Sequence, residues 1–156
     1  MLKMSDKVHC YKIVVIGDAK TYKTSFLEKH LTGSYAEKYS PTHGVEVKPF
    51  CFNTNYGCIT LNIWDCAGQE HLSGLKEEYY REASACLVFY NTPESKSNVK
   101  KWKTLFADRV SNGIVLEVDS RLSMSDDGYT VFLELLRQLT GKSNLTFVGF
   151  PPAERN

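Results

Sequence analysis

The sequence predicts an α/β fold: an open, mostly parallel sheet with one antiparallel hairpin strand. Short apolar runs alternate along the chain with segments of helical spacing. Two strand-like runs are separated only by Asn55-Tyr56-Gly57, which is a hairpin signal. The order of elements is therefore β-α-β-β-α-β-α-β-α, which is typical of such a sheet.

The first three elements follow from short patterns. Residues 11–16 form an apolar run and predict a buried strand. Residues 24–31 predict a helix, because Leu27 and Leu31 lie one turn apart. Residues 34–44 are polar and predict a loop.

The hairpin is expected to join strands at residues 45–54 and 58–64. Apolar and polar side chains alternate in the second strand, as they do in a strand with one buried face. Pro49 in the first strand indicates an edge strand, because proline has no N–H to donate to a neighbour. The apolar run at residues 83–90 predicts a central strand.

The last third of the chain predicts a helix, a short strand and a second helix. Val99, Trp102 and Phe106 follow helical spacing, and residues 114–116 are apolar and strand-like. The final helix is marked by four apolar residues at helical spacing, Phe132, Leu135, Leu136 and Leu139. Asp126 or Asp127 could cap it, and Gly141 would end it.

The composition indicates one soluble domain. The net charge of +1 gives no general attraction to nucleic acid or to an anionic membrane, and no apolar run has the length of a membrane span. Residues 1–9 lack the apolar stretch of a signal peptide, so we expect an intracellular protein whose five cysteines are unpaired. We expect a domain at residues 10–150, between a flexible N-terminal tail (1–9) and a C-terminal tail (151–156).

The loop after the first strand is the first candidate site. In the P-loop motif GxxxxGK[ST], backbone N–H groups wrap phosphates, the lysine reaches the terminal phosphates and the Ser/Thr hydroxyl holds Mg²⁺. The corresponding nucleotide-binding candidates here are Gly17, Asp18, Ala19, Lys20, Thr21, Tyr22, Lys23, Thr24 and Ser25. Gly17, Lys23 and Thr24 match the motif, whereas Tyr22 stands where the motif has glycine.

Tyr22 conflicts with the motif for a physical reason. Glycine lets the backbone approach a phosphate without a Cβ and tolerates unusual dihedral angles. Tyrosine costs about 1–2 kcal/mol if the position needs a left-handed conformation, and its ring would compete with phosphate for space. Ala19 and Lys20 add bulk, although Lys20 could also contribute positive charge. Taken alone, the segment fits equally well a strand–turn–helix with a surface lysine.

The second candidate loop follows the second hairpin strand and reads Asp65-Cys66-Ala67-Gly68-Gln69-Glu70. An aspartate at a strand end can hold Mg²⁺, the Gly68 N–H can bind a terminal phosphate, and Gln69 can orient an attacking water. Cys66 beside it is either a reactive thiol or a buried structural residue.

With these two loops in order, the chain resembles the Ras-like small GTPases, and within them it is most similar to the Ran family of nuclear-transport GTPases. The similar stretches run from about Tyr11 to Phe150 and include His30-Leu31-Thr32-Gly33, Gly44-Val45-Glu46-Val47 and Asp65-Cys66-Ala67-Gly68-Gln69-Glu70. The resemblance implies a P-loop small G-domain fold.

The resemblance also implies a site and its surroundings. GTP or GDP and Mg²⁺ would be the cofactors, with Thr24, Thr42 and Asp65 as metal ligands. Gln69 would be catalytic, and Thr42 and Gly68 would contact the nucleotide. Nuclear transport receptors and GTPase regulators would be the partners of a monomer in the nucleus and cytoplasm that binds neither nucleic acid nor membrane.

The guanine-reading motifs of that family do not occur in this chain. The family uses an Asn-Lys-x-Asp segment and a later Ser-Ala-Lys loop, whereas Glu117-Val118-Asp119 stands at the first of these places. About one strand and one helix have no counterpart, so the sheet should be shortened at one edge. Asp119 is either the remnant of the base-reading aspartate or part of the later loop.

Three functions are compatible with these matching and missing motifs. The first is a GTP/GDP switch of nucleocytoplasmic transport with a degraded nucleotide site. The second is a pseudo-GTPase that binds protein partners without nucleotide turnover. The third, a P-loop phosphotransferase for another base, explains the lost base motif but not Tyr22.

Overall fold

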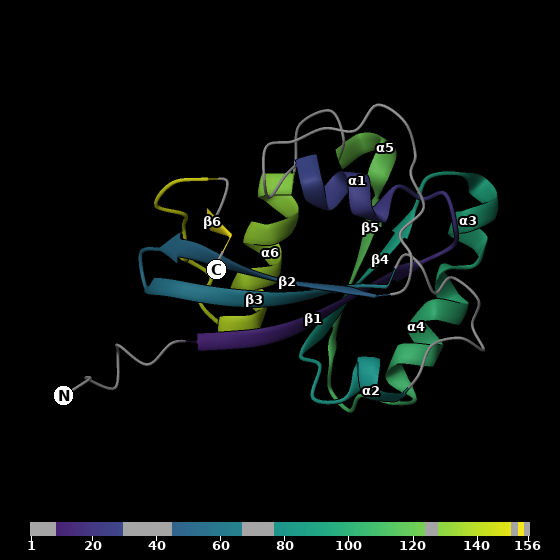
Figure 1. Ribbon diagram of the computed structural model, residues 1–156, viewed down its shortest axis with the longest axis horizontal. Helices are drawn as coiled ribbons and strands as arrows, with labels where there is room; N and C mark the ends of the chain where they lie inside the picture. The colour runs from purple at the N-terminus through teal and green to yellow at the C-terminus, as the bar shows by residue number, and fades with distance from the viewer. Residues whose placement is uncertain (1–8, 30–44, 67–76, 124–127, 151–152, 155–156) are drawn as a thin grey trace.

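Six strands form one sheet in the computed structural model, which describes residues 9–29, 45–66, 77–123, 128–150 and 153–154. The order of strands across the sheet is β5-β4-β1-β3-β2-β6 (Figure 1). Their bounds are β1 His9–Gly17, β2 Glu46–Thr54, β3 Gly57–Asp65, β4 Ala85–Tyr90, β5 Ile114–Asp119 and β6 Ala153–Glu154.

The pairing confirms the predicted fold class. Strand β1 runs parallel to both β3 and β4, and β4 runs parallel to β5. Strands β2 and β3 form the predicted antiparallel hairpin. On the other side, β5 has no further neighbour among the described residues, in agreement with the expected shortening.

Helices cover both faces of the sheet. Helices α1, α5 and α6 lie on one face, and α2 and α4 lie on the other (Figure 1). Their bounds are α1 Lys23–Leu27, α2 Glu77–Tyr80, α3 Pro93–Ser97, α4 Val99–Ala107, α5 Ser120–Ser123 and α6 Gly128–Thr140. None of the helices in the described segments is long and apolar enough to cross a membrane.

The two faces have separate cores because neighbouring residues of a strand point to opposite faces. In β1, Val15 belongs to the cluster beneath α6, whereas Val14 belongs to the cluster beneath α4. Aromatic rings fill the first cluster, with the rings of Phe26 and Phe89 4.9 Å apart. The apolar face of α4 fills the second cluster, where Trp102 is buried as its spacing predicted.

Strand β2 was predicted to lie at the edge of the sheet, but a short sixth strand pairs with its outer side. Strand β6 pairs with β2 at Phe50 and Cys51, so these two residues have a neighbour on both sides. Pro49, which has no N–H to donate, lies just outside this pairing. Within the same hairpin a disulfide joins Cys51 to Cys58, so the expectation that all five cysteines are unpaired was wrong.

The chain after α6 returns to the hairpin turn. The Val148 N–H donates to the Asn53 carbonyl at 2.7 Å, and the Thr146 N–H donates to Asn55 Oδ1 at 2.8 Å. Phe147 packs against Phe52, with ring centroids 5.6 Å apart. Residues 144–148 are therefore part of the packed domain.

Candidate functional site

The candidate loops lie at one edge of the sheet, where the parallel strands end. Gly17 at the end of β1 lies opposite Phe89 in β4, and Asp65 at the end of β3 lies opposite Val15. Asp119 ends β5 in the same way. In open α/β sheets, this edge is where ligands bind.

The phosphate loop (residues 17–24) has a backbone shape that favours glycine at three positions. Gly17 has φ +145°, and a Cβ built on it would lie 2.5 Å from the Phe89 carbonyl oxygen. Lys20 and Tyr22 have φ 62° and φ 60°, which are left-handed values. The predicted conflict at Tyr22 is thus confirmed, and Lys20 shares it.

The Lys23 ammonium lies inside the curl of this loop. The side chain is 2% exposed, and its Nζ donates to the carbonyl oxygens of Gly17 at 3.1 Å and Asp18 at 2.6 Å. A third hydrogen bond of 3.1 Å reaches Thr21 Oγ1. The loop therefore binds the buried ammonium through its own oxygen atoms, which an anionic ligand would have to replace.

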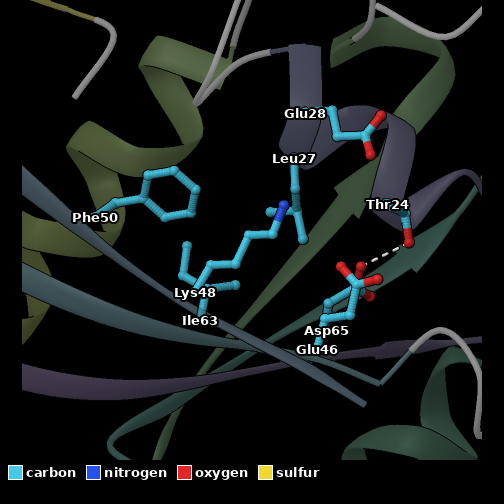
Figure 2. Close-up of a pocket in the computed structure, with 8 residues that line it drawn as sticks. All are labelled: Thr24, Leu27, Glu28, Glu46, Lys48, Phe50, Ile63 and Asp65. Carbon is cyan, nitrogen blue, oxygen red and sulfur yellow. Dashed lines mark hydrogen bonds between the residues drawn. The ribbon is translucent and has the colours of Figure 1, made fainter. Parts of the chain in front are cut away.

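Thr24 and Asp65 meet beside this loop. Thr24 Oγ1 donates to Asp65 Oδ2 at 2.6 Å (Figure 2). Asp65 is 5% exposed, and Thr24 is part-buried at the start of α1. A hydroxyl and a carboxylate are oxygen ligands of the kind that Mg²⁺ accepts together with phosphates. The two residues predicted as metal ligands in the described part of the chain are therefore brought together, and their chemistry fits Mg²⁺.

A small cavity adjoins this pair, between α1 and the hairpin (Figure 2). Its volume of about 20 Å³ has room for about one water molecule. Leu27, Phe50 and Ile63 form its apolar wall, and Glu46 lies opposite Asp65 in the ladder. The cavity is too small for a nucleotide and belongs to the surroundings of the metal-ligand pair.

Other candidates of the phosphate loop have structural positions. Thr21 is fully buried, and its hydroxyl donates to the Asp18 carbonyl at 2.8 Å. Ser25 is buried in the first turn of α1. Ala19, Lys20 and Tyr22 line a polar hollow of about 450 Å³ between the loop and the start of α3.

Tyr22 is 38% exposed and lines this hollow beside the phosphate loop, and the competition of its ring with phosphate stays a prediction. The backbone conformation of Tyr22 remains its main conflict with the motif. Thr42, Gly68 and Gln69, which were predicted to contact nucleotide, metal or water, lie outside the described residues.

Asp119 lies at the site edge, but Arg121 engages its carboxylate. Asp119 Oδ1 accepts from the Arg121 backbone N–H at 3.0 Å, and Oδ2 accepts from Arg121 Nη2 at 3.2 Å. The Arg121 side chain is 61% exposed, whereas that of Asp119 is 10% exposed. A base that used Asp119 would have to share it with this guanidinium.

Three residues near the loop were missed by the sequence reasoning. Asn98 and Trp102 bind the Asp18 carboxylate, and Asn91 Nδ2 donates to the Lys20 carbonyl at 2.9 Å. Asn91 follows β4 directly, so its place at a strand end could have identified it. No local pattern links Asp18 to Trp102, which is 84 residues away.

Cys66 is buried beside Asp65 and is 2% exposed. Desolvation by burial, together with the Asp65 charge, raises the pKa of its thiol to about 12. Because the thiolate is the reactive form, the structural reading of Cys66 is favoured over the reactive one.

The site falls within a stretch of the chain that matches a known protein family. Residues 12–123 match the family model described as Ras of Complex, Roc, domain of DAPkinase. The matched range covers well over half of the chain. It begins within β1, ends at the last residue of α5, and includes the phosphate loop, Asp65 and Asp119.

Proposed function

The chain belongs to the Roc family of Ras-like P-loop GTPase domains, and we propose that it is a GTP/GDP switch with a degraded nucleotide site. The observation that carries the proposal is the placement of the Lys23 ammonium inside the phosphate loop, next to the Thr24–Asp65 pair. These residues would bind phosphate and metal. The degraded features are the left-handed backbone at Lys20 and Tyr22 and the missing guanine-binding motif near Asp119.

The retained residues have distinct roles in nucleotide binding. Lys23 would exchange loop carbonyl partners for phosphate oxygens, and its burial would strengthen that attraction. Thr24 and Asp65 would hold Mg²⁺, which neutralises charge on the phosphates when it is bound. Thr42 would complete the metal ligands, and the Gly68 N–H would bind the terminal phosphate.

Hydrolysis in this proposal depends on Gln69, which would orient the attacking water. We expect turnover far below that of an intact small GTPase, because strain in the phosphate loop and the lost base contacts both weaken positioning of the nucleotide. Single-turnover hydrolysis of GTP measures this directly, and a rate equal to that of an intact family member would contradict it.

Weak guanine selection follows from the base-reading edge. Two lost hydrogen bonds to a charged carboxylate, each worth about 1.5–3 kcal/mol, weaken binding by at least about a hundredfold. Arg121 should weaken guanine binding further, because its guanidinium already donates hydrogen bonds to the Asp119 carboxylate.

The first experiment is a titration with fluorescent GDP and GTP in the presence of Mg²⁺, with ATP as the competitor. We expect saturable binding that Lys23→Met weakens at least about tenfold, because methionine keeps the apolar length of the side chain but not its charge. Lys101→Met, on the exposed side of α4, is the matched control. Displacement by ATP at equal concentration would favour the phosphotransferase for another base.

A pseudo-GTPase is the second candidate function. It is favoured by the left-handed backbone at Lys20 and Tyr22 and by the engagement of Asp119. Such a protein would use its folded surface for protein partners. Absence of any nucleotide binding up to about 1 mM, by a folded protein, would replace the switch by this candidate.

A role in nucleocytoplasmic transport is the finer part of the proposal. It is supported by the similarity to the Ran family around residues 30–33 and 44–47. Nuclear transport receptors and GTPase regulators would be the partners, with the protein in both nucleus and cytoplasm. Binding of a purified transport receptor that depends on added GTP would support this role, and equal binding with GDP, GTP or neither would contradict it.

A further inference from the structure

The carboxylate of Asp18 is bound by Trp102 in α4 and by Asn98 just before this helix, although Asp18 belongs to the phosphate loop. Asp18 Oδ1 accepts from Trp102 Nε1 at 2.8 Å, and Asp18 Oδ2 accepts from Asn98 Nδ2 at 2.7 Å. Trp102 is 3% exposed and part of the core beneath α4. Both carboxylate oxygens are thus held, one by Trp102 of α4 and the other by Asn98, the residue just before α4.

A third hydrogen bond holds the loop two residues further on. Asn91 Nδ2 donates to the Lys20 carbonyl at 2.9 Å. Asn91 is itself held, because its backbone N–H donates to Ser95 Oγ at 2.9 Å. The loop is therefore held on both sides of Ala19, from α4 and from the segment between β4 and α3.

These contacts bear on the strained part of the loop. Lys20 and Tyr22 both have left-handed backbone angles, which non-glycine residues keep only where the surroundings enforce them. The Asp18 carbonyl also accepts the shortest hydrogen bond of the Lys23 ammonium, at 2.6 Å. One residue thus connects α4 with the cation that would meet phosphate.

We propose that Asp18 is a positioning residue, which holds the phosphate loop and the Lys23 ammonium in binding geometry through its hydrogen bonds to Trp102 and Asn98. The proposal deepens the proposed nucleotide-binding function and rests on it. In this proposal the Asp18 carboxylate binds Trp102 and Asn98 and does not contact the nucleotide. The indole N–H signal of Trp102 should therefore report whether the contact with Asp18 is made.

Three variants test this role. Trp102→Phe keeps most of the ring but removes the indole N–H, and Asp18→Leu removes both acceptors. Asp18→Asn keeps an acceptor for Trp102, and Asn98 can turn its amide to present its oxygen, so this variant should restore the wild-type behaviour. Trp64→Phe is the matched control, because it makes the same substitution at a tryptophan that packs on Lys12 and Tyr79.

The first readout is hydrogen exchange of the backbone amides of residues 18–24, compared with amides in β1 and β3. Trp102→Phe and Asp18→Leu should exchange at least about tenfold faster in the loop than wild type, with little change in the strands. The indole N–H resonance of Trp102 should shift in Asp18→Leu but not in Asp18→Asn. Unchanged loop exchange in Trp102→Phe, or equal acceleration in loop and strands, would overturn the proposal.

The second readout is the affinity for GDP and for pyrophosphate, which Trp102→Phe should lower about tenfold and Trp64→Phe should leave unchanged. If the wild-type protein binds neither ligand, the proposed function fails, while loop exchange still decides the role of Asp18. If it binds both and loop exchange is unaffected by the variants, the positioning role fails alone.

Discussion

Thr24 Oγ1 lies 2.6 Å from Asp65 Oδ2, although the two residues are 41 positions apart in the sequence. The hydrogen bond joins the start of α1 to the end of β3. The same two oxygens can turn to a bound cation, so the pair is both a structural link and a metal-ligand pair. Its removal should therefore affect stability and Mg²⁺ dependence together.

Thr24→Val should destabilise the fold by about 1.5–3 kcal/mol, the usual range for a hydrogen bond to a charged group. The variant should also lose most of the increase in GDP affinity that Mg²⁺ gives, while binding measured in EDTA stays near the wild-type value. Urea unfolding and GDP titration with and without Mg²⁺ measure the two effects. Thr140→Val, which removes a hydrogen bond to the uncharged Leu136 carbonyl, is the control. Equal Mg²⁺ dependence in Thr24→Val and wild type would rule out Thr24 as a ligand.

Tyr22→Gly should stabilise the protein by about 1 kcal/mol and raise its affinity for GDP, because glycine adopts the left-handed backbone without strain. Lys20→Gly should also relieve strain, but it removes a charge near the loop. Ala19→Gly is the matched control, since Ala19 is not among the described residues with positive φ and gains only backbone freedom. If Tyr22→Gly binds no better than wild type, the missing base contacts are the main obstruction.

Gly17→Ala should be strongly destabilising, by about 3 kcal/mol or more. The new Cβ would lie 2.5 Å from a backbone oxygen of Phe89, and φ is +145°. Gly141→Ala offers a comparison, because its φ of +70° is strained but its Cβ would have nothing within 4 Å. Thermal unfolding should place the cost of Gly141→Ala near 1 kcal/mol. Similar costs for the two variants would show that the contact with Phe89 is not decisive.

Tyr80→Phe should leave stability unchanged or raise it by about 1 kcal/mol. The side chain is 1% exposed, and its hydroxyl has no hydrogen-bond partner among the described residues. Deleting an unsatisfied buried hydroxyl removes its desolvation cost and keeps the ring against Phe106. A loss above about 1 kcal/mol in chemical unfolding would mean that the hydroxyl does have a partner.

Thiol labelling should separate the cysteines by burial. Cys10 is exposed and should react first with iodoacetamide in the native protein, whereas Cys66 and Cys86 are buried. The pKa of Cys66 is raised to about 12 by burial, so its labelling should stay slow from pH 7 to pH 9. Cys51 and Cys58 should label only after reduction. Peptide mapping by mass spectrometry reads out each site, and fast labelling of Cys66 would contradict its burial.

Much of the fold could be predicted because its signals are local. The apolar runs of β1 and β4 indicate strands covered on both faces, and Asn55-Tyr56-Gly57 indicates the hairpin. Strand β6 was not predicted, because Ala153 and Glu154 carry no pattern of their own.

The site was predicted only where a motif exists. Lys23, Thr24 and Asp65 were identified from spacing, and the structure brings them together. The contact of Asp18 with Trp102 could not be foreseen, because it depends on how α4 packs on the sheet. The pairing of Cys51 with Cys58 was missed because the protein was expected in a reducing compartment, where disulfides are rare.

The return of residues 144–148 to the hairpin turn has a consequence during synthesis. Asn55 bonds to Asn144 and Thr146, which are 89 and 91 positions later in the chain. The β2–β3 hairpin therefore emerges from the ribosome well before residues 144–148, which cover its turn and pack on the Phe52 ring. Contacts of such long range slow folding and leave apolar surface open to other chains meanwhile. We expect the nascent protein to need protection by chaperones until α6 and residues 144–148 have left the exit tunnel.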